Sequence, residues 1–167
     1  LGAKSLGVAL VLAPTGNCIS AGRFSPSYAR ANGHYVINHS ISHPNLSNLS
    51  YSSVRYQLGS PGVVTSYGRP PYGSYDFTVR DAYASKGMRI WTWDVDTSDY
   101  TGRTQAQVVN HVVTYSRAGD TVLMHMGWNA FNKSAIAAMK SGLAAKGLGV
   151  CRNPGTTTPT YPKTIGC

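Results

Sequence analysis

Short apolar runs bounded by Gly, Ser or Asn recur along this chain, and segments with helical spacing separate them. The runs have the length and the residue types of buried strands. They cover residues 7–13, 35–38, 62–65, 88–94 and 121–125. The pattern therefore predicts five short strands, with connections long enough to hold helices between them.

Five of the connecting segments carry helix signals. Ser25 is placed to cap the first helix and Pro26 to open it, and an Ala-rich segment near the end stops before Gly147. The predicted helices cover residues 25–32, 47–58, 74–86, 105–118 and 134–146. Alternation of strand and helix is typical of an α/β domain with a mostly parallel sheet or barrel, in which the carboxyl ends of the strands supply the site residues.

The length of 167 residues suits a single domain spanning 1–167, with a Pro- and Thr-rich tail at 153–167. The longest apolar stretch, residues 6–14, is far shorter than the roughly 20 residues of a membrane-spanning helix, so no membrane span is expected. This stretch follows Lys4 and has two interpretations, a secretory signal peptide or a buried first strand of a mature protein. We favour the buried strand.

The charge balance is strongly basic, with 15 Lys and Arg against 6 Asp and Glu and a formal charge of +9. Such a charge favours polyanionic surroundings, for example a cell-wall polymer, an acidic glycan or nucleic acid. The basic residues are scattered singly, however, which favours a solvated basic surface over a specific nucleic-acid site. We expect a monomer.

The three cysteines, Cys18, Cys151 and Cys167, form no metal-binding C-x-x-C pair. We expect a disulfide between Cys151 and Cys167 that closes the tail and leaves Cys18 unpaired, and pairing of Cys18 with either of the others stays open. A disulfide would fit an oxidising environment, so we expect a secreted or extracellular protein.

Candidate chemistry begins with the segment His39-Ser40-Ile41-Ser42-His43-Pro44, which follows a predicted strand. Two imidazoles four residues apart can face one ion if the chain between them turns, and imidazole is a common ligand of zinc. Pro44 disfavours a helix at His43, which predicts a turn at the strand end. The alternative is a pair of surface or hydrogen-bonded histidines.

Three later segments add groups of complementary chemistry. Arg69-Pro70-Pro71-Tyr72-Gly73 is a rigid turn that presents a guanidinium and a backbone amide. Residues 96–100 end a strand with the carboxylates Asp96 and Asp99, and residues 123–125 end another with an imidazole.

In this order the four blocks resemble the signature of the polysaccharide deacetylases, carbohydrate esterase family 4. The H-[ST]-x-x-H-P block of that family matches residues 39–44, R-x-P-Y-G matches 69–73, D-x-x-D-[WY] matches 96–100 and L-x-H matches 123–125. The resemblance covers roughly residues 28–150. It implies a deformed, partly open (β/α) barrel of mostly parallel strands, shortened relative to the family.

The resemblance also implies a metal-dependent hydrolase that removes acetyl groups from a polysaccharide of the chitin, peptidoglycan or xylan type. His39 and His43 would bind a divalent metal, expected to be zinc, and the Tyr72 backbone amide would hold the oxyanion. Arg69, with Asp96 or Asp99, would orient the acid and base groups. The remaining implied roles are a general acid at His125 and an acetyl pocket lined by Leu123.

Tryptophans are candidate contacts for the acetylated polymer. Trp93 lies on a predicted strand two residues after Trp91, so both share one face and could stack on a sugar ring or pack in the core. Trp128, just after His125, is the stronger candidate for a substrate contact at the rim of a site.

The first block of the family is missing from this sequence. Family members open with T-F-D-D-G at the end of the first strand, where one Asp is the catalytic base and the next is a metal ligand. Here residues 8–16 contain no carboxylate, the first acidic residue is Asp76, and the chain has no Glu. Asp94, Asp96 or Asp99 could complete the site, the metal could bind through two histidines and water, or the chain could be a noncatalytic glycan-binding pseudoenzyme.

Overall fold

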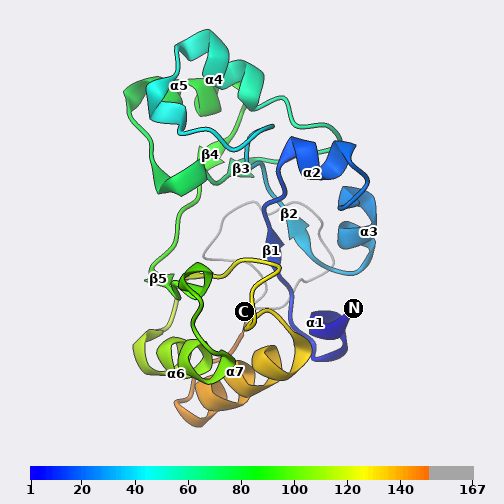
Figure 1. Ribbon diagram of the computed structural model, residues 1–167, viewed down its shortest axis with the longest axis vertical. Coiled ribbons are helices and arrows are strands. Elements are labelled where there is room, and N and C mark those ends of the chain that lie inside the picture. The colour runs from blue at the N-terminus through cyan, green and yellow to red at the C-terminus, as the bar shows by residue number, and fades with distance from the viewer. Residues whose placement is uncertain (151–167) are drawn as a thin grey trace. The chain divides into compact units, whose positions relative to one another are not determined.

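The computed structural model describes residues 1–150, which form two compact units (Figure 1). Unit I comprises residues 9–92. Unit II comprises residues 1–8 together with residues 93–150. The first few residues of the chain therefore pack with its last third.

Four short strands form the sheets of unit I, and all of them pair in parallel. They are β1 (Val11–Leu12), β2 (Tyr35–Val36), β3 (Tyr67–Gly68) and β4 (Arg89–Ile90). β1 pairs with β2, and β3 pairs with β4. A parallel bridge between Asn38 and Gly68 joins the chain just beyond β2 to β3. The carboxyl ends of β2 and β3 therefore lie together, and the chain segments that follow both strands start from the same edge.

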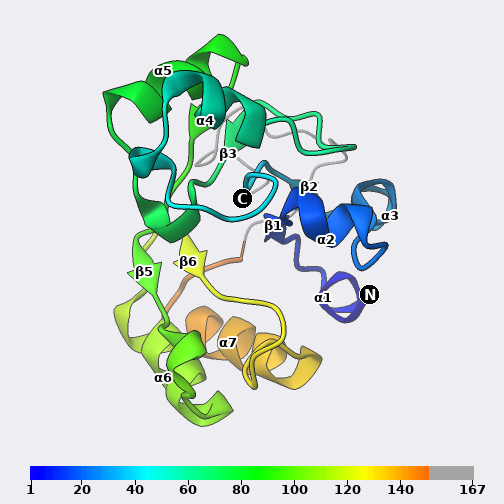
Figure 2. The ribbon, with the colours of Figure 1, turned by 45° about the horizontal axis from the view of Figure 1, so that its top comes forward.

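Helices of unit I begin after an N-cap residue whose side chain accepts a hydrogen bond from a backbone amide of the first turn. Ser25 caps one helix, as predicted, Ser50 caps a second and Asp76 a third. The helices are α2 (Gly16–Ser20), α3 (Pro26–Ala31), α4 (Tyr51–Gln57) and α5 (Phe77–Ser85), with 3₁₀ turns η1 (Leu46–Asn48) and η2 (Pro71–Gly73). α4 and α5 lie side by side over a shared apolar core (Figures 1 and 2). The buried residues of this core are Leu46, Val54, Leu58, Val79, Ala82, Tyr83 and Met88.

Unit II contains one parallel strand pair and a pair of longer helices. Its elements are α1 (Gly2–Ser5), β5 (Val95–Asp96), η3 (Asp99–Thr101), α6 (Gln105–Tyr115), β6 (Val122–Leu123) and α7 (Lys133–Ala145). Thr104 and Gln107 form a reciprocal capping box at the start of α6. α6 and α7 lie side by side in both views (Figures 1 and 2) and bury Val108, Val112, Ala135 and Met139 between them.

The structure confirms the α/β class and the parallel strands, but corrects one strand. Residues 62–65 do not form a strand, because Gly62 has a φ of 67° and the side chain of Val64 is 80% exposed, with no sheet to pack against. The Arg30 guanidinium instead holds this loop through the carbonyls of Gly62 and Val64, and the strand follows at Tyr67–Gly68. The sequence pattern also missed α1, α2 and β5.

The predictions about the cysteines and the tail fall partly outside the residues that the structure describes. Cys18 is a free, half-buried cysteine, whereas Cys151, Cys167 and the tail at 153–167 lie outside the described residues. Residues 1–150 contain no helix long and apolar enough to cross a membrane. The single-domain organisation stays a prediction.

Gly68 is required by the close approach of a core ring to β3. The Cβ of an alanine at this position would lie 2.5 Å from Cε1 of Tyr83 and 3.1 Å from the carbonyl oxygen of Asn38. We expect Gly68→Ala to lower the free energy of unfolding by about 1–3 kcal/mol through overpacking, measured by urea denaturation. Gly149→Ala, where a Cβ meets nothing, is the matched control and should leave the stability unchanged.

Candidate functional site

The two predicted metal ligands of unit I meet in space. The rings of His39 and His43 lie with their centroids 4.8 Å apart and at 74° to each other. His39 is buried and His43 is half-buried, in the loop that follows β2. The turn predicted before Pro44 therefore exists and brings both imidazoles together.

Short-range hydrogen bonds form this turn. Ser40 and His43 both adopt left-handed backbone conformations, with φ of 62° and 63°, which non-glycine residues rarely adopt. The Asn38 side chain accepts a hydrogen bond from the Ser40 amide, and the Ser40 hydroxyl accepts one from the His43 amide. Such strained residues persist where the surroundings hold them, and they are frequent at functional sites.

Gln57, at the end of α4, is a residue that the sequence analysis missed. Its Oε1 accepts hydrogen bonds from the backbone amides of Ile41 (3.1 Å) and Ser42 (3.0 Å), the residues between the paired histidines. Its Nε2 donates to the Ser42 hydroxyl. Gln57 therefore holds the loop that carries both imidazoles, and no pattern of spacing in the sequence points to it.

The tautomer of His39 follows from its contact with the next block. Nδ1 of His39 lies 2.6 Å from the backbone carbonyl oxygen of Arg69. A carbonyl can only accept, so Nδ1 carries the proton and donates, and a neutral ring then has its lone pair on Nε2. Histidines that bind metals commonly donate their other ring N–H to a carbonyl or carboxylate in this way.

The Arg69 block forms the turn η2 beside the same loop. Tyr72 has a φ of 60°, and its exposed ring packs edge-on against His43, with centroids 4.8 Å apart. Burial lowers the pKa of the Arg69 guanidinium, and the nearby Tyr83 opposes this to a smaller extent. Burial also raises the pKa of Tyr83, so its phenol stays neutral and cannot act as a counter-ion for Arg69.

The end of β1 adjoins the histidine loop. The Gly16 amide donates to the Ser40 carbonyl and the Asn17 amide donates to the Ile41 carbonyl, both at 2.9 Å. Thr15, immediately before them, caps α2 by accepting a hydrogen bond from the amide of Cys18. Residues 15–17, where the resemblance would place the missing acidic block, therefore adjoin the loop between the paired histidines, and none of them is a carboxylate.

The side chains near the histidine loop limit how a metal ion could be bound. His39 and His43 fit a divalent ion as two imidazole ligands, with the tautomer of His39 set for coordination through Nε2. Catalytic zinc sites ordinarily use three protein ligands, and residues 1–150 contain no group of three His, Cys, Asp or Glu side chains that could hold a metal. Unit I therefore brings together two candidate ligands, one fewer than such sites ordinarily use.

Unit II contains a buried carboxylate paired with the third predicted histidine. Asp99 is 1% exposed and receives two hydrogen bonds from His125, one from the ring Nδ1 at 2.7 Å and one from the backbone amide at 2.6 Å. The His125 side chain is 36% exposed, and the Tyr100 ring packs edge-on against it. The carboxylate only accepts, so Nδ1 carries the proton and Nε2 is the nitrogen left to act on a ligand.

Asp96 and Asp99 have different roles in this turn. Asp96 Oδ1 accepts a hydrogen bond from the Ser98 amide at 2.7 Å, so its carboxylate shapes the turn that presents Asp99. Arg103, a second residue that the sequence analysis missed, donates to the carbonyl oxygen of Thr97 at 3.1 Å and fixes the same turn. Of the two candidate carboxylates, Asp99 is the one that orients His125.

The predicted substrate contacts of unit II differ in accessibility. Leu123 is buried, Trp93 is half-buried and Trp128 is 44% exposed. Trp91, in unit I, is buried and packs edge-on against Tyr67, so core packing accounts for that tryptophan. The roles assigned to Leu123, Trp93 and Trp128 stay predictions.

Comparison with known proteins relates the chain to one family of enzymes. The profile of the polysaccharide deacetylase family matches residues 27–91, which hold both histidines and the Arg69 block. The chain is 34% identical over 138 residues to a bifunctional xylanase/xylan deacetylase from Cellvibrio japonicus, covering 78% of this chain. Its fold matches a family 4 carbohydrate esterase from Streptomyces lividans, solved with acetate, with a TM-score of 0.78, 27% identity and coverage of 98% of this chain and 84% of that one. This chain belongs to the polysaccharide deacetylase family.

Polysaccharide deacetylases act on acetylated glycans and are typically metal-dependent. This chain spans only 20% of the length of the bifunctional xylanase/xylan deacetylase. The fold also matches a family 4 pseudoenzyme from Bacillus anthracis, with a TM-score of 0.79, 24% identity and coverage of 89% of this chain and 55% of that one. Identity this low establishes a common fold alone.

The pairing of Asp99 with His125 can be tested by NMR. We expect Asp99→Ala to remove the preference of neutral His125 for the Nδ1–H tautomer and to lower the free energy of unfolding by about 1–3 kcal/mol, because two donors lose their acceptor. Nitrogen-15 spectra of the imidazole report the tautomer. Asp120→Ala, also in unit II, should leave it unchanged, and an unaltered spectrum in the Asp99 variant would contradict the assignment.

Proposed function

We propose that this domain is a metal-dependent hydrolase that removes acetyl groups from a polysaccharide of the chitin, peptidoglycan or xylan type. The observation that carries the proposal is the pair of imidazoles at the end of β2, in which His39 donates through Nδ1 to the Arg69 carbonyl. Zinc is the metal we propose, because imidazole is one of its usual ligands in proteins. The setting we propose is outside the cell, where such polymers occur.

In this proposal the groups of unit I bind and polarise the acetyl group. His39 and His43 would hold the ion, which would supply Lewis-acid polarisation to the acetyl carbonyl and to water. The backbone amide of Tyr72, in a turn with a left-handed φ, donates to the developing oxyanion. Arg69, a half-buried cation beside the loop, adds positive charge to the same environment.

The groups of unit II supply the proton for the leaving group. His125, as an imidazolium, donates from Nε2 to the departing amine or alcohol, while Asp99 holds Nδ1–H and stabilises the cation. Asp99 suits this task because it is almost wholly buried and already accepts two hydrogen bonds from His125. Leu123 lines the acetyl pocket, and Trp93 and Trp128 contact the sugar chain.

A second candidate function is noncatalytic binding of the same glycan. The observation that favours it is the segment after β1, where Gly16 and Asn17 bond to the histidine loop and residues 13–17 contain no carboxylate. The family residues that act as the base and as the third metal ligand are therefore absent from their expected place. A related fold described as a pseudoenzyme supports the idea that this architecture persists without turnover.

Acetate release separates the two functions. We expect the protein with added Zn²⁺ or Co²⁺ to release acetate from N-acetylglucosamine oligomers, peptidoglycan or acetylated xylan, and His125→Ala to lower the rate by about 100-fold or more, the usual contribution of a general acid. Absence of release with every metal would refute the hydrolase. Polysaccharide binding that survives both chelation and His125→Ala would then support the binding function.

Adding a carboxylate at Thr15 tests where the metal binds, because His39 and His43 are only two of the three protein ligands that such sites ordinarily use. We expect Thr15→Asp to raise the affinity for Co²⁺ or Zn²⁺ by about tenfold or more, since it places an anionic ligand beside the two imidazoles. Aspartate also caps helices, so α2 should be retained. Asn17→Asp adds the same charge on the same helix and should change the affinity little. Equal affinities in a competition assay with a chromophoric chelator would contradict the placement of the metal.

A further inference from the structure

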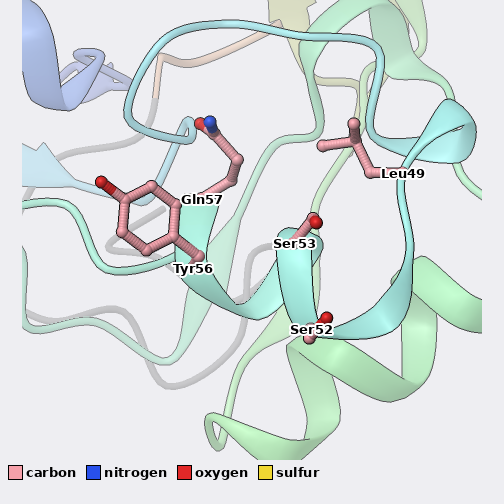
Figure 3. Close-up of a pocket in the computed structure, with 5 residues that line it drawn as sticks. All are labelled: Leu49, Ser52, Ser53, Tyr56 and Gln57. Atoms are coloured by element: carbon pink, nitrogen blue, oxygen red, sulfur yellow. The ribbon is translucent and has the colours of Figure 1, made fainter.

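A cavity of about 410 Å³ lies against α4; it is largely open to solvent and shares Gln57 with the support of the histidine loop. Its volume falls within the roughly 300–1,000 Å³ of small-molecule sites. It is lined by Leu49, Ser52, Ser53, Tyr56 and Gln57. Figure 3 shows Tyr56 and Gln57 on one side, Leu49 on the other and Ser53 between them. We propose that this cavity is a second sugar site, which holds one neutral pyranose ring of the polysaccharide; the substrate class rests on the proposed function.

The lining favours a neutral ligand. None of its five side chains is charged, although the chain as a whole carries a formal charge of +9. An anionic or cationic ligand would find no counter-ion among these lining side chains. A neutral pyranose needs none, because its hydroxyls need only hydrogen-bonding partners.

An exposed aromatic ring forms one wall. Tyr56 is 72% exposed, which is high for a large aromatic residue. Its ring is therefore available for contact with a ligand. The C–H groups on one face of a pyranose are apolar and pack on such a ring, while the equatorial hydroxyls point sideways. Tyr56 therefore provides the contact area, and the other lining residues determine which hydroxyl pattern fits.

The hydrogen-bonding groups complement the aromatic wall. Ser52 and Ser53 present hydroxyls at the first turn of α4, where both contact the capping Ser50. A hydroxyl offers one donor and two acceptor positions, so each keeps capacity for a ligand. Gln57 uses one N–H of its amide on Ser42, and an amide nitrogen carries two. The cavity thus combines one aromatic face with several small neutral polar groups.

The same cavity is connected to the histidine loop. Gln57 lines the cavity and also accepts hydrogen bonds from the amides of Ile41 and Ser42. A ring that contacts the Gln57 amide therefore contacts the group that holds the loop between His39 and His43. Sugar binding at α4 should thus be detectable at the amides of Ile41 and Ser42 as well as within the cavity.

NMR titration with short oligosaccharides tests this site directly. The ¹⁵N-labelled protein is titrated with an N-acetylglucosamine tetramer and, separately, with xylotetraose, in the presence of a chelator so that the result does not depend on a metal or on turnover. We expect saturable shifts of the Leu49, Ser53, Ile41 and Ser42 amides with at least one sugar. Tyr56→Ala should weaken this binding about five- to tenfold.

Two controls distinguish stacking from a change in the fold. Tyr56→Phe keeps the ring and should retain wild-type affinity, whereas Tyr28→Ala removes another exposed tyrosine, on α3, and should have no effect. Absence of shifts at these amides with both sugars, or equal affinity of Tyr56→Ala and the wild type, would overturn the site. Acetate release is not part of the readout, so failure of the hydrolase and failure of this site are separable results.

Discussion

Asn38 is the residue on which the arrangement of unit I depends. It is 1% exposed, and both its backbone and its side chain are bonded to other segments. Its amide donates to the Tyr67 carbonyl and its carbonyl accepts from the Arg69 amide, which forms the bridge between β2 and β3. Its side chain donates to the Leu58 carbonyl and accepts from the Ser40 amide. One buried residue therefore joins the strands through its backbone and links the end of α4 to the histidine loop through its side chain.

This junction explains why the histidine and arginine blocks act as one group although thirty residues separate them. Parallel strands place their carboxyl ends at one edge, and the bridge sets β2 and β3 so that His39 reaches the Arg69 carbonyl. Unit II uses the same principle with other residues. β5 and β6 pair in parallel, and the residues that follow them, Asp99 and His125, meet directly. Each unit therefore carries its candidate site residues where two neighbouring strands end.

The sequence predicted the parts of this arrangement that depend on local pattern. Alternating apolar runs and helical segments predicted the α/β class, and Ser25 followed by Pro26 correctly marked the start of α3. The histidine block was predicted as a turn because Pro44 restricts its neighbour. The strand assigned to residues 62–65 was wrong, because short apolar runs in exposed loops resemble short strands until a pairing partner is known.

Long-range contacts explain what the sequence could not predict. Gln57 and Arg103 each bind backbone groups of a distant or neighbouring turn, and a single polar side chain with a backbone partner leaves no periodic signal. The selection of Asp99 over Asp96 was also beyond the pattern, since both end the same strand and only the pairing of β5 with β6 decides which one His125 meets. The helix α2 is five residues long, too short for a hydrophobic period to appear.

The position of Thr15 separates folding from chemistry in this family member. As the first residue before α2 it needs only an oxygen that can accept from the Cys18 amide, and the neighbouring amides of Gly16 and Asn17 bind the histidine loop through the backbone alone. The fold therefore needs no carboxylate at this point of the chain. It is equally compatible with a neutral or an acidic side chain before α2, because both kinds of oxygen can cap a helix.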